Sequence, residues 1–307
     1  MSLVQRFVAV LAALTISALH AEPRCPGNLA GSTLRRIQDD LIVVRVRINR
    51  SGPYDFLVDT GSQITTIDPV LASDLHLRIE GTTGVSGVAT QSRSAFAFLD
   101  LIEVGSHSVP QSLAIVQDIA EIKEADPRLR GILGENFLAR FDLLIDNRRQ
   151  ILCLDTSKTL AQAIKGEHIP LERPYGPRDL LPFTGPMVVS VRMTTADVAP
   201  VLLRLDSGSN AALLYAAQPR LLRASVSRAP VLKRVVNGME QAFAVLPALD
   251  ILVGACPVRR VAFAIPINRV GSGPSPREDG LLPTSAFERV FISYSKSYAA
   301  LDPWVDR

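Results

Sequence analysis

The sequence predicts an all-β protein made of two similar halves that meet at a pair of aspartate-containing loops. Short runs of valine, isoleucine and leucine alternate with glycine, proline, serine and asparagine, a pattern typical of many strands and few helices. In each half an apolar run ends in an Asp-Thr/Ser-Gly-Ser loop, at Asp59 and at Asp206. With 307 residues, the chain can form two domains of ordinary size, each burying its own core.

Strand periodicity is clear in the first half. Between residues 42 and 48, Arg45 and Arg47 alternate with valine and isoleucine, as expected for a strand with one buried face. A second apolar run leads directly into Asp59, and a matching run in the other half leads into Asp206. Both carboxylates are therefore expected at a strand end, next to a turn.

The two halves repeat one another at a nearly constant offset. Asp59 and Asp206 are 206 − 59 = 147 residues apart, and an apolar run later in each half ends in Gly105 or Gly254, 254 − 105 = 149 residues apart. Further matching segments are Gly131-Ile132-Leu133-Gly134 with Gly280-Leu281-Leu282-Pro283, and Leu152-Cys153-Leu154-Asp155 with Ala299-Ala300-Leu301-Asp302. The repeat predicts an internal pseudo-twofold axis that brings the two aspartates together.

The composition of the two loops suits a pair of carboxylates. Gly61 and Gly208 allow the backbone to approach closely, and the flanking hydroxyl groups can orient a carboxylate. Two adjacent carboxylates share one proton, so one can act as a base while the other acts as an acid. A single Asp-Thr/Ser-Gly tripeptide is usually an Asx turn after a strand, and the repetition is what favours a paired site.

At these loops the chain resembles the pepsin-like and retropepsin-like aspartic proteases, over about residues 40–155 and 186–305. The resemblance implies an all-β, bilobal acid-protease fold made of two similar β-barrel-like lobes with the active site between them. It also implies an aspartic-type endopeptidase, a hydrolase in which Asp59 and Asp206 activate the water that attacks a peptide bond.

The resemblance assigns roles to the rest of each loop. Thr60 and Ser207 would make cross-lobe hydrogen bonds that brace the loops. Ser62 and Ser209 would support the outer oxygens of the two carboxylates. A short helix is expected at residues 135–139, after the apolar-apolar-Gly strand that packs beside the first loop.

Three features depart from the pepsin-like pattern. Pro283 stands where the first half has a glycine, so the second lobe is expected to be rebuilt there. Arg204 occupies the position of Leu57, on the same strand face as Asp206. It is expected either to lower the pKa of Asp206 from a buried position, or to reach solvent or pair with a carboxylate of the second lobe. The first-lobe flap lacks a tyrosine, which favours the single-chain, bacterial-type retropepsin-like branch.

Two segments are expected to form hairpin flaps over the site. The glycine-rich residues 81–87 are expected at the tip of a hairpin in the first lobe, and an Asn-Gly pair predicts a two-residue hairpin turn in the second. Such hairpins would hydrogen-bond an extended peptide, although each segment also suits an ordinary surface turn. The expected substrate-binding residues are Gly84, Val85, Ser86, Gly87, Asn237 and Gly238.

The domain organisation follows from the repeat and the flanking segments. Residues 1–21 resemble an export signal peptide, with an uncleaved anchor as the alternative, so the protein is expected to be periplasmic or extracellular. The predicted lobes are residues 22–160 and 186–307, joined by a Pro-rich connection at residues 161–185. No other segment is long enough to cross a membrane.

Cysteine content and charge restrict the possible cofactors and partners. Cys25, Cys153 and Cys256 allow one disulfide and one free thiol, and the sequence does not identify the pair. No metal-ligand spacing or phosphate-binding loop is present, so no metal or other cofactor is expected. A net charge of +3 is too small to indicate nucleic acid binding. The expected partner is a peptide or protein substrate.

Two alternatives to a monomeric endopeptidase remain. The first is a non-catalytic peptide-binding protein that retains the fold, for which the altered Pro283 and Arg204 are the reason. A homodimer with two sites is possible if each lobe pairs with its counterpart in another chain. The internal repeat favours a monomer with a single site.

Overall fold

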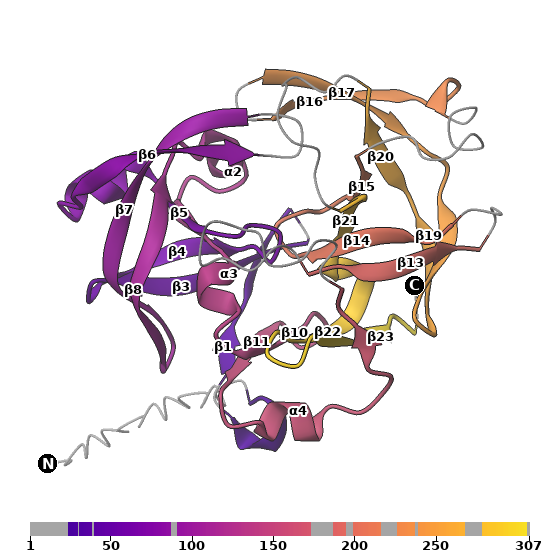
Figure 1. Cartoon of the computed structure of the whole chain (residues 1–307), viewed down its shortest axis with the longest axis horizontal. Coiled ribbons are helices and arrows are strands. Elements are labelled where there is room, and N and C mark those ends of the chain that lie inside the picture. Colours follow the sequence, from indigo (N-terminus) through magenta and orange to yellow (C-terminus); the bar gives the residue numbers. More distant parts are fainter. Residues whose placement is uncertain are drawn as a thin grey trace, which may run out of the picture.

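The computed structural model of the chain consists mostly of β-strands with few helices, arranged as two lobes above a shared sheet (Figure 1). The all-β, bilobal fold is therefore as predicted. Several of the sequence predictions lie outside the described residues, namely the export signal, part of the Pro-rich connection, Gly87, Asn237 and Gly238. The structure describes residues 24–29, 31–38, 40–86, 91–172, 187–194, 199–215, 226–236, 239–267 and 278–305.

The first lobe is an eight-stranded sheet that closes on itself. Its strands are β2 (Arg35–Ile37), β3 (Leu41–Ile48), β4 (Ser51–Val58), β5 (Thr65–Ile67), β6 (Ile79–Ser86), β7 (Gln91–Val104), β8 (His107–Val116) and β9 (Leu129–Leu133). The order is β2-β3-β4-β9-β5-β8-β7-β6, and an additional pairing of β3 with β7 closes six of these strands into a barrel. The helices α1 (Pro69–Asp74), α2 (Ala120–Ala125) and α3 (Glu135–Leu138) belong to the same part of the chain.

The second lobe contains a nine-stranded sheet. Its strands are β13 (Val189–Met193), β14 (Val201–Asp206), β15 (Ala212–Leu214), β16 (Val231–Val236), β17 (Met239–Val245), β18 (Leu249–Val253), β19 (Cys256–Val261), β20 (Phe263–Pro266) and β21 (Gly280–Pro283). The order is β16-β17-β20-β15-β21-β14-β13-β18-β19. A 3-10 helix, η2 (Thr284–Ala286), follows β21 directly.

The strand pairings of the first lobe recur in the second. The parallel pair β4–β9 corresponds to β14–β21, and the parallel pair β5–β8 corresponds to β15–β20. The antiparallel pairs β3–β4 and β5–β9 likewise correspond to β13–β14 and β15–β21. The repeated glycines, Gly105 and Gly254, occupy matching turns with φ of 58° and 60°, a conformation that favours glycine. The repeat seen in the sequence is therefore a repeat of topology.

A six-stranded sheet joins the two lobes. Its strands are β1 (Gly31–Thr33), β10 (Asp142–Asp146), β11 (Ile151–Asp155), β12 (Ile169–Pro170), β22 (Phe287–Ser293) and β23 (Tyr298–Pro303). The order is β1-β11-β10-β22-β23-β12, so the central pair, β10 with β22, comes from different halves of the chain. The Pro-rich connection is partly regular, because it contains the end of α4 (Thr159–Ala163) and the whole of β12.

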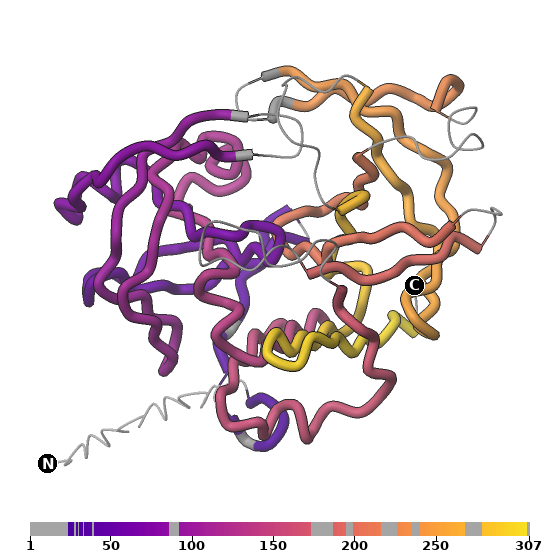
Figure 2. Tube along the Cα trace, in the orientation of Figure 1, coloured from indigo at the N-terminus to yellow at the C-terminus, as the bar shows by residue number. Residues whose placement is uncertain are grey.

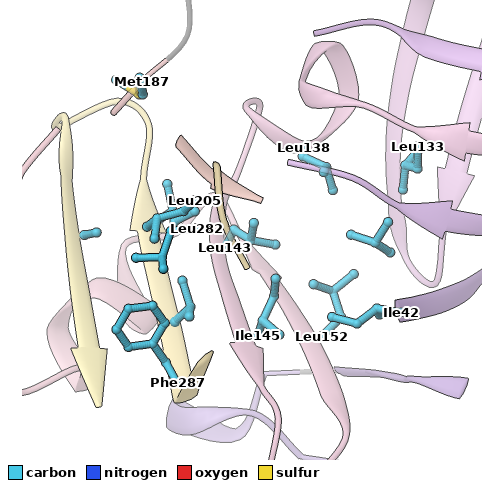
Figure 3. Close-up of a cluster of buried hydrophobic side chains, with 14 of the residues drawn as sticks. Ile42, Leu133, Leu138, Leu143, Ile145, Leu152, Met187, Leu205, Leu282 and Phe287 are labelled. Carbon is cyan, nitrogen blue, oxygen red and sulfur yellow. The ribbon is translucent and has the colours of Figure 1, made fainter. Parts of the chain in front are cut away.

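One hydrophobic core runs through all three sheets. Figure 3 shows Ile42 of β3, Leu143 and Ile145 of β10 and Leu205 of β14 in a single cluster of buried side chains. The predicted alternation of β3 is present, since its arginines are exposed while its valines and isoleucines are buried. The shared sheet and core join the lobes along their base.

The N-terminal segment is attached to the six-stranded sheet. Cys25 forms a disulfide with Cys153 of β11, which answers the question of pairing that the sequence left open, and Cys256 is a buried free thiol. A 3-10 helix, η1 (Pro26–Asn28), lies beside α4 below this sheet (Figure 2). In the described parts of the chain, no helix is long and apolar enough to cross a membrane.

Candidate active site

The two aspartate loops lie at equivalent ends of the central strands β4 and β14. Asp59 follows β4 directly, and its N–H donates to the carbonyl of Leu133 on the neighbouring parallel strand (3.0 Å). Asp206 is the last residue of β14 and pairs in register with Pro283 of β21. In both lobes a parallel neighbour therefore fixes the strand end from which the carboxylate projects.

Thr60 and Ser207 connect the loops across the interface between the lobes. Thr60 N–H donates to Ser207 Oγ (3.1 Å), and Ser207 N–H donates to Thr60 Oγ1 (3.1 Å). The hydroxyl of Thr60 donates to the carbonyl of Leu205 (2.8 Å), and that of Ser207 donates to the carbonyl of Val58 (2.8 Å). These four buried bonds are reciprocal, so they hold the two loops in a symmetric arrangement.

The loop glycines allow each loop to lie against the aspartate of the other lobe. A Cβ atom added to Gly61 would lie 2.6 Å from Cγ of Asp206. A Cβ atom added to Gly208 would overlap the carboxyl group of Asp59 in the same way. Glycine is therefore required at both positions for close approach, and the two carboxylates face the same narrow interface.

The hydrogen bonding of the two carboxylates is asymmetric. Asp59 accepts from Gly61 N–H (2.7 Å) and Ser62 N–H (3.1 Å) at Oδ1, and from Ser62 Oγ (2.7 Å) at Oδ2. Asp206 accepts from Gly208 N–H (2.7 Å) at Oδ1. The hydroxyl of Ser209 instead donates to the carbonyl of Ala211 (2.8 Å), so the predicted support of the outer Asp206 oxygen by Ser209 is not seen. Ser209 turns back on its own loop because that carbonyl lies within local reach.

Burial and a like charge change the acidity of one carboxyl. Asp206 is 5% exposed, and this burial raises its pKa well above the ordinary value for aspartate. The neighbouring carboxylate of Asp59 raises it further, whereas Gly208 N–H and the guanidinium of Arg204 act in the opposite direction. The pair is thus suited to hold one proton on Asp206 while Asp59, with three donors, carries the negative charge.

Arg204 is buried behind the two loops. Its Nη2 forms an ion pair with Glu278 Oε1 at 3.2 Å, and its Nη1 donates to the carbonyl of Gly61 in the other lobe. Both expectations for this residue are partly right. Arg204 pairs with a second-lobe carboxylate, and it also acts on Asp206 from a buried position, but it does not reach solvent.

The segment after the strand beside each loop differs between the lobes, as Pro283 predicts. In the first lobe Gly134 N–H donates to Thr65 Oγ1 (3.2 Å), and a Cβ atom added to Gly134 would lie 2.7 Å from the backbone carbonyl carbon of Ile64. The predicted short helix follows as α3. In the second lobe Pro283 has no N–H to donate, and η2 replaces the helix.

The flap segments lie in hairpins at the same edge of the molecule (Figure 1). Gly84, Val85 and Ser86 belong to the β6 arm of the β6–β7 hairpin, so these three residues lie in an arm and not at the tip as predicted. Strands β16 and β17 pair antiparallel up to Val236 and Met239, and the predicted Asn-Gly turn between them lies outside the described residues.

The sequence did not identify Glu278 or Glu135 as part of this region. Glu278 ion-pairs with Arg204, and Glu135 acts electrostatically on Arg204 and on the buried Tyr294. The unusual charge at Arg204 was a usable signal, since a buried arginine requires a carboxylate partner, although it does not indicate which one. Within the described ranges, no group of three or more metal-ligating side chains is present.

Comparison with known families gives one match at this site. Residues 44–137 match the family model described as "Aspartyl protease". The match spans less than a third of the 307-residue chain, from β3 to α3, and so includes the Asp59 loop but not the Asp206 loop. It supports an aspartic protease family and a peptidase-type hydrolase. A search of curated proteins finds no match.

Proposed function

We propose that this protein is an aspartic-type endopeptidase of the retropepsin-like branch, with Asp59 and Asp206 as its catalytic pair. The observation that carries the proposal is the reciprocal packing of two Asp-Thr/Ser-Gly loops, in which each glycine lies against the opposite carboxyl group. The match of residues 44–137 to the aspartyl protease family supports the peptidase class and includes the Asp59 loop.

The asymmetry of the pair suggests how the two roles are divided. Three donors stabilise negative charge on Asp59, so it acts as the base that takes a proton from the attacking water. Burial keeps the proton on Asp206, which donates it to the carbonyl oxygen of the scissile peptide. The water oxygen bonds to the carbonyl carbon. The C–N bond then breaks as the leaving nitrogen takes the proton that Asp59 removed from the water, and a hydroxyl on the former carbonyl carbon returns a proton to Asp206. The hairpins β6–β7 and β16–β17 would pair with the extended substrate.

The test is digestion of a peptide library by the mature chain from about pH 3 to pH 8, because the rate of acid–base catalysis depends on the protonation of both carboxyl groups. Asp59→Asn and Asp206→Asn should each lower the cleavage rate by at least about a hundredfold, because each removes an acid or base. The exposed Asp74→Asn is the matched control and should cleave like the wild type. A chelator should have no effect. Cleavage that survives both active-site changes would contradict the proposal.

A non-catalytic peptide-binding protein is the second candidate. Pro283, and the turning of Ser209 away from Asp206, favour it because both make the second lobe differ from the first. Folded protein that binds extended peptides but cleaves none across the pH range would support this alternative.

The cellular location and assembly form part of the proposal. The Cys25–Cys153 disulfide supports export to an oxidising compartment, periplasmic or extracellular, because structural disulfides persist there. The joining of both lobes in one six-stranded sheet supports a monomer that carries one site. Cell fractionation and sizing in solution would test the two statements.

A further inference from the structure

Arg204 is an unusual residue for an interior strand of the nine-stranded sheet. It is charged and only 6% exposed, and it occupies the position held by the buried Leu57 in the first lobe. Burying an arginine costs free energy unless its charge is compensated by specific partners. The partners of Arg204 therefore indicate what its charge does.

The guanidinium of Arg204 contacts both lobes. Within the second lobe, Nη2 pairs with Glu278, whose side chain is also nearly buried, at 3.2 Å from Oε1. Across the interface, Nη1 donates to the carbonyl oxygen of Gly61, inside the first Asp-Thr-Gly loop. The planar, forked guanidinium allows both contacts at once, which a lysine ammonium on the same strand would not do as well.

The carbonyl of Gly61 belongs to the peptide group whose N–H is that of Ser62. That N–H donates to Asp59 Oδ1 at 3.1 Å. A continuous chain of hydrogen bonds thus runs from Arg204, through one peptide group, to the carboxylate of Asp59. A cation at the oxygen end of a peptide polarises it and strengthens the donation from its nitrogen end.

We propose that Arg204 is a positioning residue that stabilises the single negative charge of the catalytic pair, by polarising the Gly61–Ser62 peptide that donates to Asp59, with Glu278 fixing the orientation of Arg204. The inference rests on the proposed function in so far as it concerns catalysis. The first lobe cannot make the equivalent contact to the second aspartate loop, because Leu57 stands at the position that matches Arg204.

Several other ionisable groups lie in this region. Burial lowers the pKa of Arg204, but nearby anionic groups, Glu278 foremost, outweigh it and raise the pKa overall, so the guanidinium stays charged. Burial raises the pKa of Tyr294, as do Glu135 and Asp59, while Arg204 opposes them. Arg204 carries the positive charge among these ionisable side chains. The ionisable groups that face it or the aspartate pair are Asp59, Asp206, Glu135, Glu278, Tyr215 and Tyr294.

The test replaces both members of the ion pair, because Arg204→Met alone would leave Glu278 as an unpaired buried charge. In the Arg204→Met/Glu278→Gln variant, loss of the cation should make the first ionisation of the aspartate pair less favourable. The pH midpoint of this ionisation should rise by about one pH unit. It is followed by carboxyl ¹³C NMR, and the signals are assigned by comparison with Asp59→Asn. Arg192→Met, which removes an exposed arginine from β13, is the matched control and should titrate like the wild type.

Arg204→Lys provides a second variant, which keeps the positive charge but loses the planar, forked guanidinium group. Its titration should lie between those of the wild type and the double variant. The acidic limb of the pH profile of kcat/KM should move in parallel, with the change in kcat larger than that in KM. A double variant that titrates like the wild type would overturn the inference. The NMR measurement needs no cleavage, so it decides the inference even if the peptidase proposal fails.

Discussion

Asp206 lowers the stability of the folded protein at neutral pH, and this effect can be measured without any substrate. Its pKa is raised in the folded chain, so the folded state binds its proton more tightly than the unfolded state does. The stability contributed by the protonated group is complete below the unfolded pKa, near 3.8, and is lost as the pH rises towards the folded value. Asp206→Asn keeps an acceptor for Gly208 N–H and is neutral in both the folded and the unfolded state, so it does not need to take up a proton on folding. We therefore expect Asp206→Asn to stabilise the protein at pH 7 by about 1 kcal/mol or more, because each unit by which the pKa is raised is worth about 1.4 kcal/mol.

The comparison with acid conditions distinguishes this effect from a packing change. Below about pH 3.5 both the wild type and Asp206→Asn carry a neutral group, so the difference in free energy of unfolding should vanish there. Urea denaturation at several pH values measures it directly. A gain that is equal at all pH values would show that charge is not its cause, and a loss at pH 7 would contradict the prediction.

At the level of strands, the tight packing of β9 and β21 against their neighbours leads to a prediction for both lobes. Alanine at Gly280 would overlap the carbonyl oxygen of Leu213, and alanine at Gly131 would overlap the Phe56 ring and the carbonyl oxygen of Thr66. Each substitution should cost about 1–3 kcal/mol by overpacking, measured as a lower midpoint of chemical denaturation. Gly84→Ala is the matched control for stability, because its Cβ has no neighbour within 4 Å. Equal midpoints for all three would contradict the packing of these strands.

The strands and turns that depend on local pattern were predictable, and those that depend on distant partners were not. The alternation around Arg45 and Arg47 and the positions of the repeated glycines fix strands and turns through neighbouring residues. Ser209 has the same residue type as Ser62 but makes a different bond, because the chain that follows it takes a different course. The partner of Arg204 likewise lies far along the chain, so the sequence could only indicate that one was needed.

The joining of the two lobes also depends on contacts that a repeat does not reveal. Each lobe contributes a similar strand pair, β10–β11 and β22–β23, and these pairs join at β10 and β22. The two-residue strand β12 is too short to produce a periodic pattern, so the Pro-rich connection gave no sign of it. This shared sheet matters for the site, because the loops of Asp59 and Asp206 can face one another only if the lobes are held in register.

The Cys25–Cys153 disulfide stabilises this same sheet. It closes a sequence separation of 128 residues and ties the N-terminal segment to β11. In the chain-entropy treatment a loop of that length contributes about 4–5 kcal/mol, and measured values are often smaller. Cys25→Ser should therefore lower the free energy of unfolding by several kcal/mol.

In the native protein Cys256 should not react with a thiol reagent, because burial raises its pKa to about 11. Cys256→Ser is the control and should leave the disulfide intact in a non-reducing peptide map. A native thiol that reacts quickly, or a map that links Cys256 to either partner, would contradict this pairing and with it the attachment of the N-terminus to the six-stranded sheet.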